Sequence, residues 1–229
     1  MNLSIDTSTR YATIALADAG NVISELSWYS NQNHTVELVP NIELLLNENN
    51  VKYSDLSVIG VAVGPGNFSA VRVALSVVKG LAIALGVQVA PASTLLIEAY
   101  PYLATGFPVV ATIGAGRGQL VSASYQDQSN GMLLETPMKL LTPHELFGMY
   151  DVESSKPLLC GEGMSGMTDE DLVTASERFI MTSAEMRPSR RASSIIHLLR
   201  EGHVSLVEDS AAIEPIYARA ATITPPKSQ

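Results

Sequence analysis

Short apolar segments separated by tight turns open the chain. Residues 3–6, 11–17 and 22–29 read as strands, and the turn Ala19-Gly20-Asn21 joins the second to the third. Consecutive strands with turns this short predict an antiparallel meander. The run 58–63 is apolar almost throughout, which is typical of a strand buried on both faces of a sheet.

Helical spacing follows in residues 34–47, 68–85 and 93–102. The first of these helices has two apolar faces, and Pro40 is expected to bend or restart it. In the second helix nearly every position is apolar or small, apart from one narrow stripe made by Arg72, Ser76 and Lys79. A sheet covers only one side of such a helix. Its other side therefore meets either the neighbouring helix or another protein, and we expect a partner interface.

The pattern then repeats. Residues 109–113, 119–125 and 132–140 read as three strands, and a helix (142–149), a strand (156–160) and a helix (188–200) follow. Two such sets predict an α/β protein in which each half is a mixed sheet with helices on its faces. We place the halves at residues 1–105 and 106–221, with a frayed polar tail at 222–229.

Charge and composition narrow the range of partners. The formal net charge of −9 repels phosphate backbones, which predicts no direct nucleic-acid binding by the lone chain. The cluster Arg187, Arg190 and Arg191 is interpreted as decorating the start of a helix. Charged residues make up 16% of the chain, against the ~25% usual for soluble proteins. This shortage fits either a large Ala- and Val-rich core or a surface partly hidden against another protein.

The expected compartment is the cytoplasm. A single cysteine, Cys160, excludes an internal disulfide and suits reducing conditions. The first residues lack the basic and apolar regions of a signal peptide. The apolar run within residues 71–85 is interrupted by polar side chains, so we expect it to be too short and too polar to span a membrane.

Two segments are candidates for binding chemistry. The loop at residues 64–69, Gly-Pro-Gly-Asn-Phe-Ser, could present backbone N–H groups to an anion at a helix N-terminus. No Walker-type lysine follows it, so a rigid turn capped by Asn67 or Ser69 is the simpler interpretation. The segment Asp6-Thr7-Ser8 fits either a magnesium or phosphate contact or an Asx-type turn. The candidate phosphate or nucleotide contacts are Asp6, Thr7, Ser8, Gly64, Gly66 and Asn67.

Nothing else in the sequence points to catalysis or to a metal site. The four histidines are not spaced to share a helical face with nearby acids. The segment Gly163-Met164-Ser165-Gly166 misses the nucleophile-elbow pattern by one residue. Cys160 reads as a buried strand residue rather than a nucleophile. We therefore assign no catalytic and no metal-binding residue.

With these segments in place, the chain resembles the bacterial TsaB (YeaZ) family over roughly residues 2–220. The glycine loop carries most of this resemblance, because the family's version reads GPGSFTG followed by an arginine, here Arg72. The other matching pieces, in order, are Ile5-Asp6-Thr7-Ser8-Thr9, His34-Thr35, Leu38-Val39-Pro40, Ser93-Thr94-Leu95 and Glu214-Pro215-Ile216-Tyr217. The family is similar to the actin-like ATPase superfamily, so the resemblance implies two RNase H-like halves.

The resemblance also implies a function. The family acts in forming threonylcarbamoyladenosine at position 37 of tRNAs that read ANN codons. Its catalytic paralogue, TsaD, carries an HxxxH metal motif that this chain lacks. The implied role is that of a non-catalytic partner of TsaD, in an assembly that the ATPase TsaE also binds. No cofactor is implied for the lone chain, and ATP or ADP with magnesium is expected only in that assembly.

In the family, the subunit interface uses the helices that match residues 34–47 and 68–85, the same helices that show excess apolar faces here. The same surface can pair two copies of the chain when TsaD is absent. The expected interface residues are Val36, Val39, Ile42, Leu46, Phe68, Val73, Val77, Gly80, Leu81 and Ala84.

One segment departs from the family pattern, and other functions stay open. Where the family carries D-A-R-x-G, this chain has Gly114-Ala115-Gly116-Arg117-Gly118, and the extra glycines are expected to loosen the turn. The alternative functions are a nucleotide-binding actin-like phosphotransferase or M22-type peptidase acting alone, and a homodimeric scaffold with no role in tRNA modification.

Overall fold

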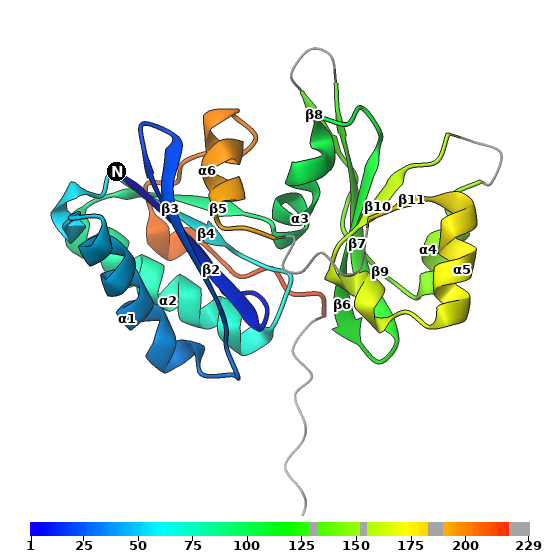
Figure 1. The fold of residues 1–229 in the computed structure, drawn as a ribbon, viewed down its shortest axis with the longest axis horizontal. Helices are drawn as coiled ribbons and strands as arrows, with labels where there is room; N and C mark the ends of the chain where they lie inside the picture. The colour runs from blue at the N-terminus through cyan, green and yellow to red at the C-terminus, as the bar shows by residue number, and fades with distance from the viewer. Residues whose placement is uncertain (129–131, 152–154, 183–189, 220–229) are drawn as a thin grey trace, which may run out of the picture.

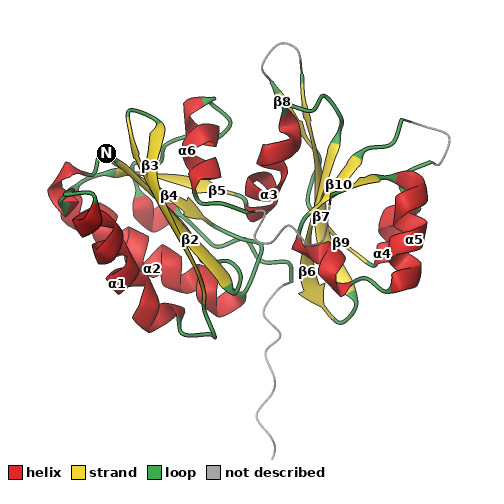
Figure 2. Ribbon diagram, viewed as in Figure 1, coloured by secondary structure: helices red, strands yellow, loops and turns green. Residues whose placement is uncertain are grey.

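Two mixed β-sheets organise the chain, one in each lobe (Figures 1 and 2). The computed structural model describes residues 1–128, 132–151, 155–182 and 190–219. The first sheet has the strand order β3-β2-β1-β4-β5. Strands β1 to β3 form the predicted antiparallel meander, and β4 and β5 run parallel to β1. These strands are β1 (Asn2–Asp6), β2 (Tyr11–Asp18), β3 (Asn21–Tyr29), β4 (Val58–Ala62) and β5 (Gln88–Ala92).

The second sheet has the order β11-β10-β6-β7-β8, with β9 also paired to β7. It again combines antiparallel strands, β6 to β9, with strands that run parallel to β6. Its strands are β6 (Val109–Gly116), β7 (Gln119–Asp127), β8 (Leu133–Glu135), β9 (Lys139–Leu141), β10 (Leu158–Cys160) and β11 (Ile180–Met181). The prediction of one strand over residues 132–140 was wrong. Pro137 separates β8 from β9, since proline cannot donate a hydrogen bond to a sheet.

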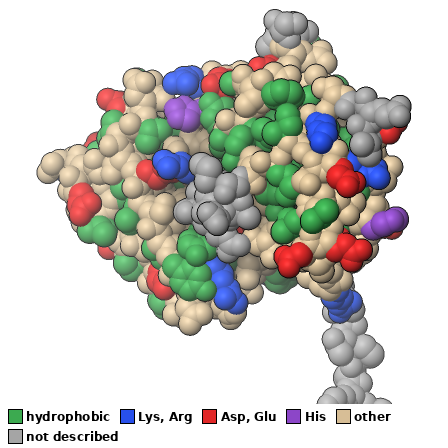
Figure 3. All heavy atoms as spheres, turned by 45° about the vertical axis from the view of Figure 1, so that its right-hand side comes forward, with side chains coloured by type: hydrophobic (Ala, Val, Ile, Leu, Met, Phe, Trp, Pro, Cys, Tyr) green, Lys and Arg blue, Asp and Glu red, His purple; other side chains and the backbone are tan. Residues whose placement is uncertain are grey.

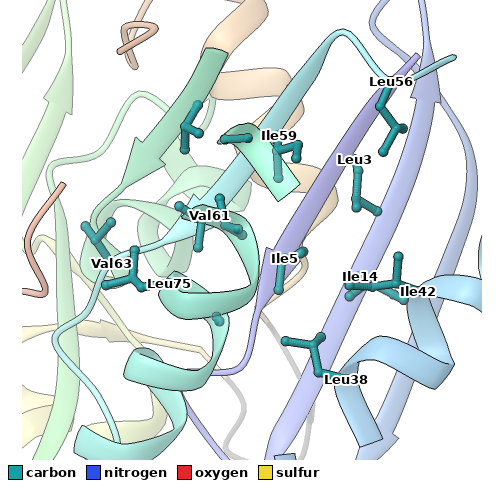
Figure 4. Close-up of a cluster of buried hydrophobic side chains, with 14 of the residues drawn as sticks. Leu3, Ile5, Ile14, Leu38, Ile42, Leu56, Ile59, Val61, Val63 and Leu75 are labelled. Carbon is teal, nitrogen blue, oxygen red and sulfur yellow. The ribbon is translucent and has the colours of Figure 1, made fainter. Parts of the chain in front are cut away.

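Helices cover both faces of the first sheet. On one face, α1 (His34–Glu48) packs over β2 and β3, and α2 (Phe68–Leu85) packs over β4, β1 and β5. Figure 4 shows Leu38 and Ile42 of α1 pointing toward Ile14 of β2 within the buried cluster. Helix α1 continues through Pro40 without restarting.

The opposite face of the first sheet carries α6 (Ser193–Arg200), which comes from the far end of the chain (Figure 1). Gly60 permits this approach, because a Cβ on Gly60 would lie 2.7 Å from Cγ2 of Ile195. The predicted start of this helix at residue 188 lies outside the described residues, as does the tail at 222–229. The division of the chain at residue 105 stays a prediction. The structure adds that residues 193–200 pack on the first sheet.

The second lobe is covered by shorter helices. Helix α3 (Thr94–Leu103) packs against β6, β7 and β10 and also touches α6, so it lies between the two sheets. On the outer face, α4 (Pro143–Phe147) and α5 (Asp169–Arg178) pack together. Helix α5 was not predicted, although Thr168 and Asp171 form a capping box at its start. The predicted α/β fold with two mixed sheets, one in each lobe, is confirmed.

Local signals set both ends of α2. The side-chain oxygen of Asn67 accepts hydrogen bonds from the backbone N–H groups of Ser69 and Ala70, both at 3.1 Å. At the other end, Gly86 adopts a left-handed conformation with φ of 67° and donates its N–H to the carbonyl of Ala82. The predicted range of 68–85 is therefore confirmed, with Asn67 as the cap.

By length and composition alone, α2 is long and apolar enough to cross a membrane, with 18 residues and a mean hydropathy of 1.8. The expectation that it is too short and too polar was wrong by those two criteria. In the first lobe, one side of α2 packs on the sheet, and a third of the helix is buried. Its buried side chains are Ala70, Val71, Ala74, Leu75, Val78 and Ala82.

Candidate functional site

The outer face of α1 and α2 keeps exposed apolar side chains. On α1, Val36 is 71% exposed and Val39 is 40% exposed, and near the end of α2, Ile83 is 73% exposed. The two helices pack side by side on one face of the first sheet (Figure 1), so both present an outer side away from that sheet. We call this outer side the α1–α2 face and define it by Val36, Val39, Leu44, Gly80, Ile83 and Ala84.

Not every expected interface residue belongs to the α1–α2 face. Ile42 and Leu46 are buried in the core beneath α1, so their assignment to a partner surface was wrong. The hydrophobic periodicity identified two faces of this helix but did not show which one packs on the sheet. Val73, Val77 and Leu81 are intermediate, since they are half-buried and pack against the same core.

Phe68 lies at the junction between α2 and the space separating the lobes. It is 45% exposed, and its ring stacks on that of Tyr217 with a centroid distance of 4.8 Å. The guanidinium of Arg72 lies 5.1 Å from the centre of the Phe68 ring. Phe68 thus contacts the C-terminal segment of its own chain.

A cavity of about 580 Å³ lies between the lobes. Ser8, Gly66 and Asn67 line it from the first lobe, as the sequence analysis expected of a binding site. On its other side it is lined by Glu98 of α3, which lies between the sheets, and by Glu162, which follows β10 of the second sheet. Asp6, Thr7 and Gly64 do not line the cavity, so the structure brings together only part of the predicted set.

The carboxylate of Asp6 is engaged by its own chain. Asp6 is 1% exposed, and its Oδ1 accepts hydrogen bonds from the backbone N–H and the hydroxyl of Ser8. The bond from the Ser8 N–H, at 2.8 Å, is the Asx-type turn that was one of the two interpretations of this segment. The hydroxyl of Thr7 donates to the carbonyl of Ala70 at 2.7 Å. These partners argue against Asp6 and Thr7 as magnesium or phosphate contacts.

The glycines of the 64–69 loop are explained by close backbone packing. A Cβ on Gly66 would lie 2.5 Å from the carbonyl oxygen of Ser8. Gly64 has φ of 100°, and a Cβ there would lie 2.4 Å from the carbonyl oxygen of Ile216. The loop is therefore held between the end of β1 and the C-terminal segment, and this arrangement fits the rigid turn better than an anion site.

A buried ion cluster that the sequence analysis missed lies at the base of the cavity. Arg190, 5% exposed, places Nε 2.6 Å from Oδ2 of Asp6 and Nη1 3.4 Å from Oε2 of Glu98, and its Nη2 is 4.0 Å from Oε2 of Glu162. Burial alone would lower the pKa of Arg190, but the carboxylates of Asp6, Glu162 and Glu98 outweigh burial and raise it.

The interpretation of the basic cluster as helix decoration was wrong for Arg190. It holds for Arg191, which is exposed and lies 3.6 Å from Glu25, whereas Arg187 lies outside the described residues. Asp6 and Arg190 are 184 positions apart, so no local pattern could have paired them.

The hairpin that departs from the family pattern is tightly closed. Gly116, Arg117 and Gly118 all have positive φ, of 70°, 56° and 69°. The side chain of Arg219 donates to the Gly116 carbonyl at 3.4 Å and to the side chain of Gln119. This contact from the C-terminal segment holds the turn that the extra glycines were expected to loosen.

No group of three or more histidine, cysteine, aspartate or glutamate side chains in the described part of the chain is placed to hold a metal ion. Cys160 is fully buried, and burial raises the pKa of its thiol well above the ordinary value, as expected of a structural strand residue. On the face drawn in Figure 3, basic side chains are scattered singly among acidic ones rather than gathered in one patch.

Known proteins resemble the chain both in sequence and in structure. Residues 23–150 match the family described as "TsaD: tRNA N6-adenosine threonylcarbamoyltransferase". The chain is 31% identical to the tRNA threonylcarbamoyladenosine biosynthesis protein TsaB of Bacillus subtilis, over 96% of this chain and 94% of that protein. It is 26% identical to the protein of the same name from Escherichia coli, over 95% of this chain and 94% of that protein.

A solved structure agrees with these matches. YeaZ from Pseudomonas aeruginosa superimposes with a TM-score of 0.74 at 26% identity, and the superposition covers 94% of this chain and 98% of that one. The similarity therefore extends over both lobes rather than over a single sheet.

Proposed function

The chain belongs to the TsaB family of tRNA threonylcarbamoyladenosine biosynthesis proteins, and from this we propose that it is the non-catalytic subunit that binds and activates a TsaD-type threonylcarbamoyltransferase. In this role it supplies a docking surface rather than reacting groups. The product of the assembly is N6-threonylcarbamoyladenosine at position 37 of ANN-decoding tRNAs.

The observation that carries this proposal is the α1–α2 face. Val36 and Ile83, both more than 70% exposed, lie on helices whose inner sides already fill the core of the first lobe. A partner that covers them removes apolar surface from water, which stabilises association by roughly 25 cal/mol per Å². Half-buried Val73, Val77 and Leu81 would extend the contact if the partner's side chains reach between the helices.

The match to the TsaD family also supports the α1–α2 face as the docking surface. Residues 23–150, which match the TsaD family, include both α1 and α2. Two chains built on the same helices can pair face to face about an approximate twofold axis, as subunits of a symmetric dimer do. The same geometry lets two copies of this chain pair when the transferase is absent, so a homodimer competes for the α1–α2 face.

Further features fit a subunit without its own chemistry. The four histidines include no pair with the HxxxH spacing that the resemblance assigns to TsaD. We propose that the lone chain needs no cofactor, and that ATP or ADP with magnesium enters only with TsaE in the larger assembly. The net charge of −9 supports a chain that binds no tRNA by itself, and its single cysteine supports the cytoplasm as its compartment.

Reconstitution tests the proposal. Purified chain, TsaD and TsaE from the same organism are combined with tRNA and with the threonylcarbamoyl donor, and the modified nucleoside is measured by mass spectrometry. We expect no product from the chain alone and full activity only when it accompanies TsaD and TsaE. Equal activity of TsaD and TsaE without the chain, or product from the chain alone, would refute the proposal.

A further inference from the structure

The cleft between the lobes is placed where α/β proteins bind ligands. Asp6 ends β1, and the 64–69 loop follows β4, its parallel neighbour in the sheet. In open α/β sheets, ligands bind outside the carboxyl ends of the strands. A two-lobe protein that used a magnesium nucleotide would bring phosphates to the N-terminus of α2 and the metal to the strand-end carboxylate.

The residues present do not fit that ligand. At the start of α2, the N–H groups of Ser69 and Ala70 are already bonded to the side chain of Asn67, and the N–H of Asn67 is bonded to the carbonyl of Ser8. The oxygens of Asp6 accept hydrogen bonds from Ser8 and Arg190. The metal and the phosphates would have to displace all of these partners.

Arg190 instead connects three separate parts of the molecule. Its partners are Asp6 at the end of β1 in the first sheet, Glu98 on α3 between the sheets, and Glu162 after β10 in the second sheet. Arg190 itself lies three residues before α6, which packs on the first sheet. One guanidinium thus bridges carboxylates from both lobes.

We infer that the Arg190 guanidinium is an internal cation that occupies the metal position of the cleft and fastens the two lobes together. Guanidinium is well suited to this position because it is always charged and presents several donors in a fixed plane. It closes the position to a divalent metal, so the lone chain takes up no magnesium nucleotide there. This inference concerns the lone chain and does not depend on the proposed function.

Removal of the guanidinium has two measurable consequences. Asp6 and Glu98 then lose their contacts with the guanidinium, and breaking a buried ion pair is strongly destabilising. For a chain of this size we expect Arg190→Ala to lower the melting temperature by roughly 6 to 20 °C. The space that the guanidinium group leaves can be filled again by free guanidinium ion, which carries the same charge and the same kind of N–H donors.

The test is thermal unfolding of the lone chain with added guanidinium ion. Wild type, Arg190→Ala and the neighbouring control Arg191→Ala are each melted in guanidinium chloride at low millimolar concentration. Sodium chloride of equal ionic strength is the reference, because it removes general screening effects. We expect guanidinium chloride to raise the melting temperature of Arg190→Ala alone. Arg191→Ala should differ from wild type by less than about 4 °C, because its ion pair is exposed.

Several outcomes would overturn the inference. If Arg190→Ala is as stable as Arg191→Ala, the ion cluster does not fasten the lobes. If Arg190→Ala is destabilised but gains nothing from guanidinium ion, the guanidinium group is not what this position requires, and the inference fails. Calorimetric titration of wild type with magnesium ATP provides a measurement that needs no variant, and tight binding in the cleft would refute the inference outright.

If Arg190→Ala does not fold, two variants of similar side-chain length replace it. Arg190→Lys keeps the positive charge, whereas Arg190→Met keeps only the volume. We expect Arg190→Lys to melt at the higher temperature of the two. Equal melting temperatures would show that the charge of Arg190 is not what the cluster requires.

Discussion

Substitution of Val36 by glutamate tests whether the exposed side of α1 serves to bind a partner or to stabilise the fold. Val36 is 71% exposed in the first turn of α1, where an acidic side chain is favoured by the helix dipole. Exposed substitutions of this kind change the free energy of unfolding by less than about 0.5 kcal/mol, which corresponds to at most about 2 °C in a chain of this size. The folded lone chain should therefore tolerate Val36→Glu.

Binding of the TsaD-type subunit should not tolerate it. The substitution removes apolar burial worth about 1.5 kcal/mol for a fully covered valine. It also forces an unpaired carboxylate against the partner, and burying a polar group without a hydrogen bond costs about 2 kcal/mol or more. The sum of about 3.5 kcal/mol corresponds to a loss of roughly 300-fold in affinity.

The assay is calorimetric titration of the transferase with wild-type chain, Val36→Glu and a matched control. Val173→Glu is the control, because Val173 is 64% exposed on α5 in the other lobe. We expect Val173→Glu to bind as wild type does. Unchanged affinity of Val36→Glu would refute the α1–α2 face as the docking surface. A melting temperature of the lone variant far below that of Val173→Glu would refute the exposure argument on which it rests.

Two further predictions concern the fold itself. Gly161→Ala should destabilise the lone chain by roughly 2 to 6 kcal/mol, because φ is +107° and a Cβ would lie 2.2 Å from the carbonyl oxygen of Thr112. Gly166→Ala, where a Cβ would meet no atom within 4 Å, is the control for denaturant melts, and equal effects of the two would contradict the steric argument. Burial and a hydrogen bond to Glu201 raise the pKa of Tyr100 to about 12. The unfolded state loses this proton near pH 10, whereas the native state keeps it until about pH 12. The contribution of Tyr100 to the free energy of unfolding should therefore fall progressively as the pH rises from 10 to 12. Denaturant midpoints of wild type and Tyr100→Phe across that range should converge as the pH rises, and a constant difference between them would contradict the assignment.

The elements that the sequence predicted well are those set by neighbouring residues. Asn67 and Gly86 bound α2 through contacts within one helical turn, so its range of 68–85 could be predicted. Helix α5 was missed because it buries only Ala175 and so carries little apolar periodicity. Its one usable signal was the capping box formed by Thr168 and Asp171.

The features that could not be predicted depend on contacts distant in sequence. The pairing of Asp6 with Arg190 spans 184 positions, and it determines whether the strand-end acid meets a metal or an arginine. The burial of Ile42 likewise depends on how α1 is rotated on the sheet, since periodicity gives the faces of a helix but not their order. A metal or phosphate site predicted from local motifs is therefore least reliable where a charged side chain from a distant part of the sequence can fill it.

The ion cluster and the α1–α2 face both favour a docking subunit over an independent enzyme. A buried ion pair is a weak source of net stability, because desolvation cancels much of its attraction. The hypothesis that accounts for the Arg190 cluster is that it fixes geometry, holding the end of β1, α3 and the residues after β10 in one arrangement. An enzyme that admits and releases a nucleotide needs lobes that open and close. A subunit that presents a preformed surface gains affinity from rigidity, because less conformational freedom is lost on binding. An ion cluster that holds the two lobes in one arrangement therefore favours the proposed docking role. The same cluster would hinder an independent phosphotransferase, whose lobes must open and close.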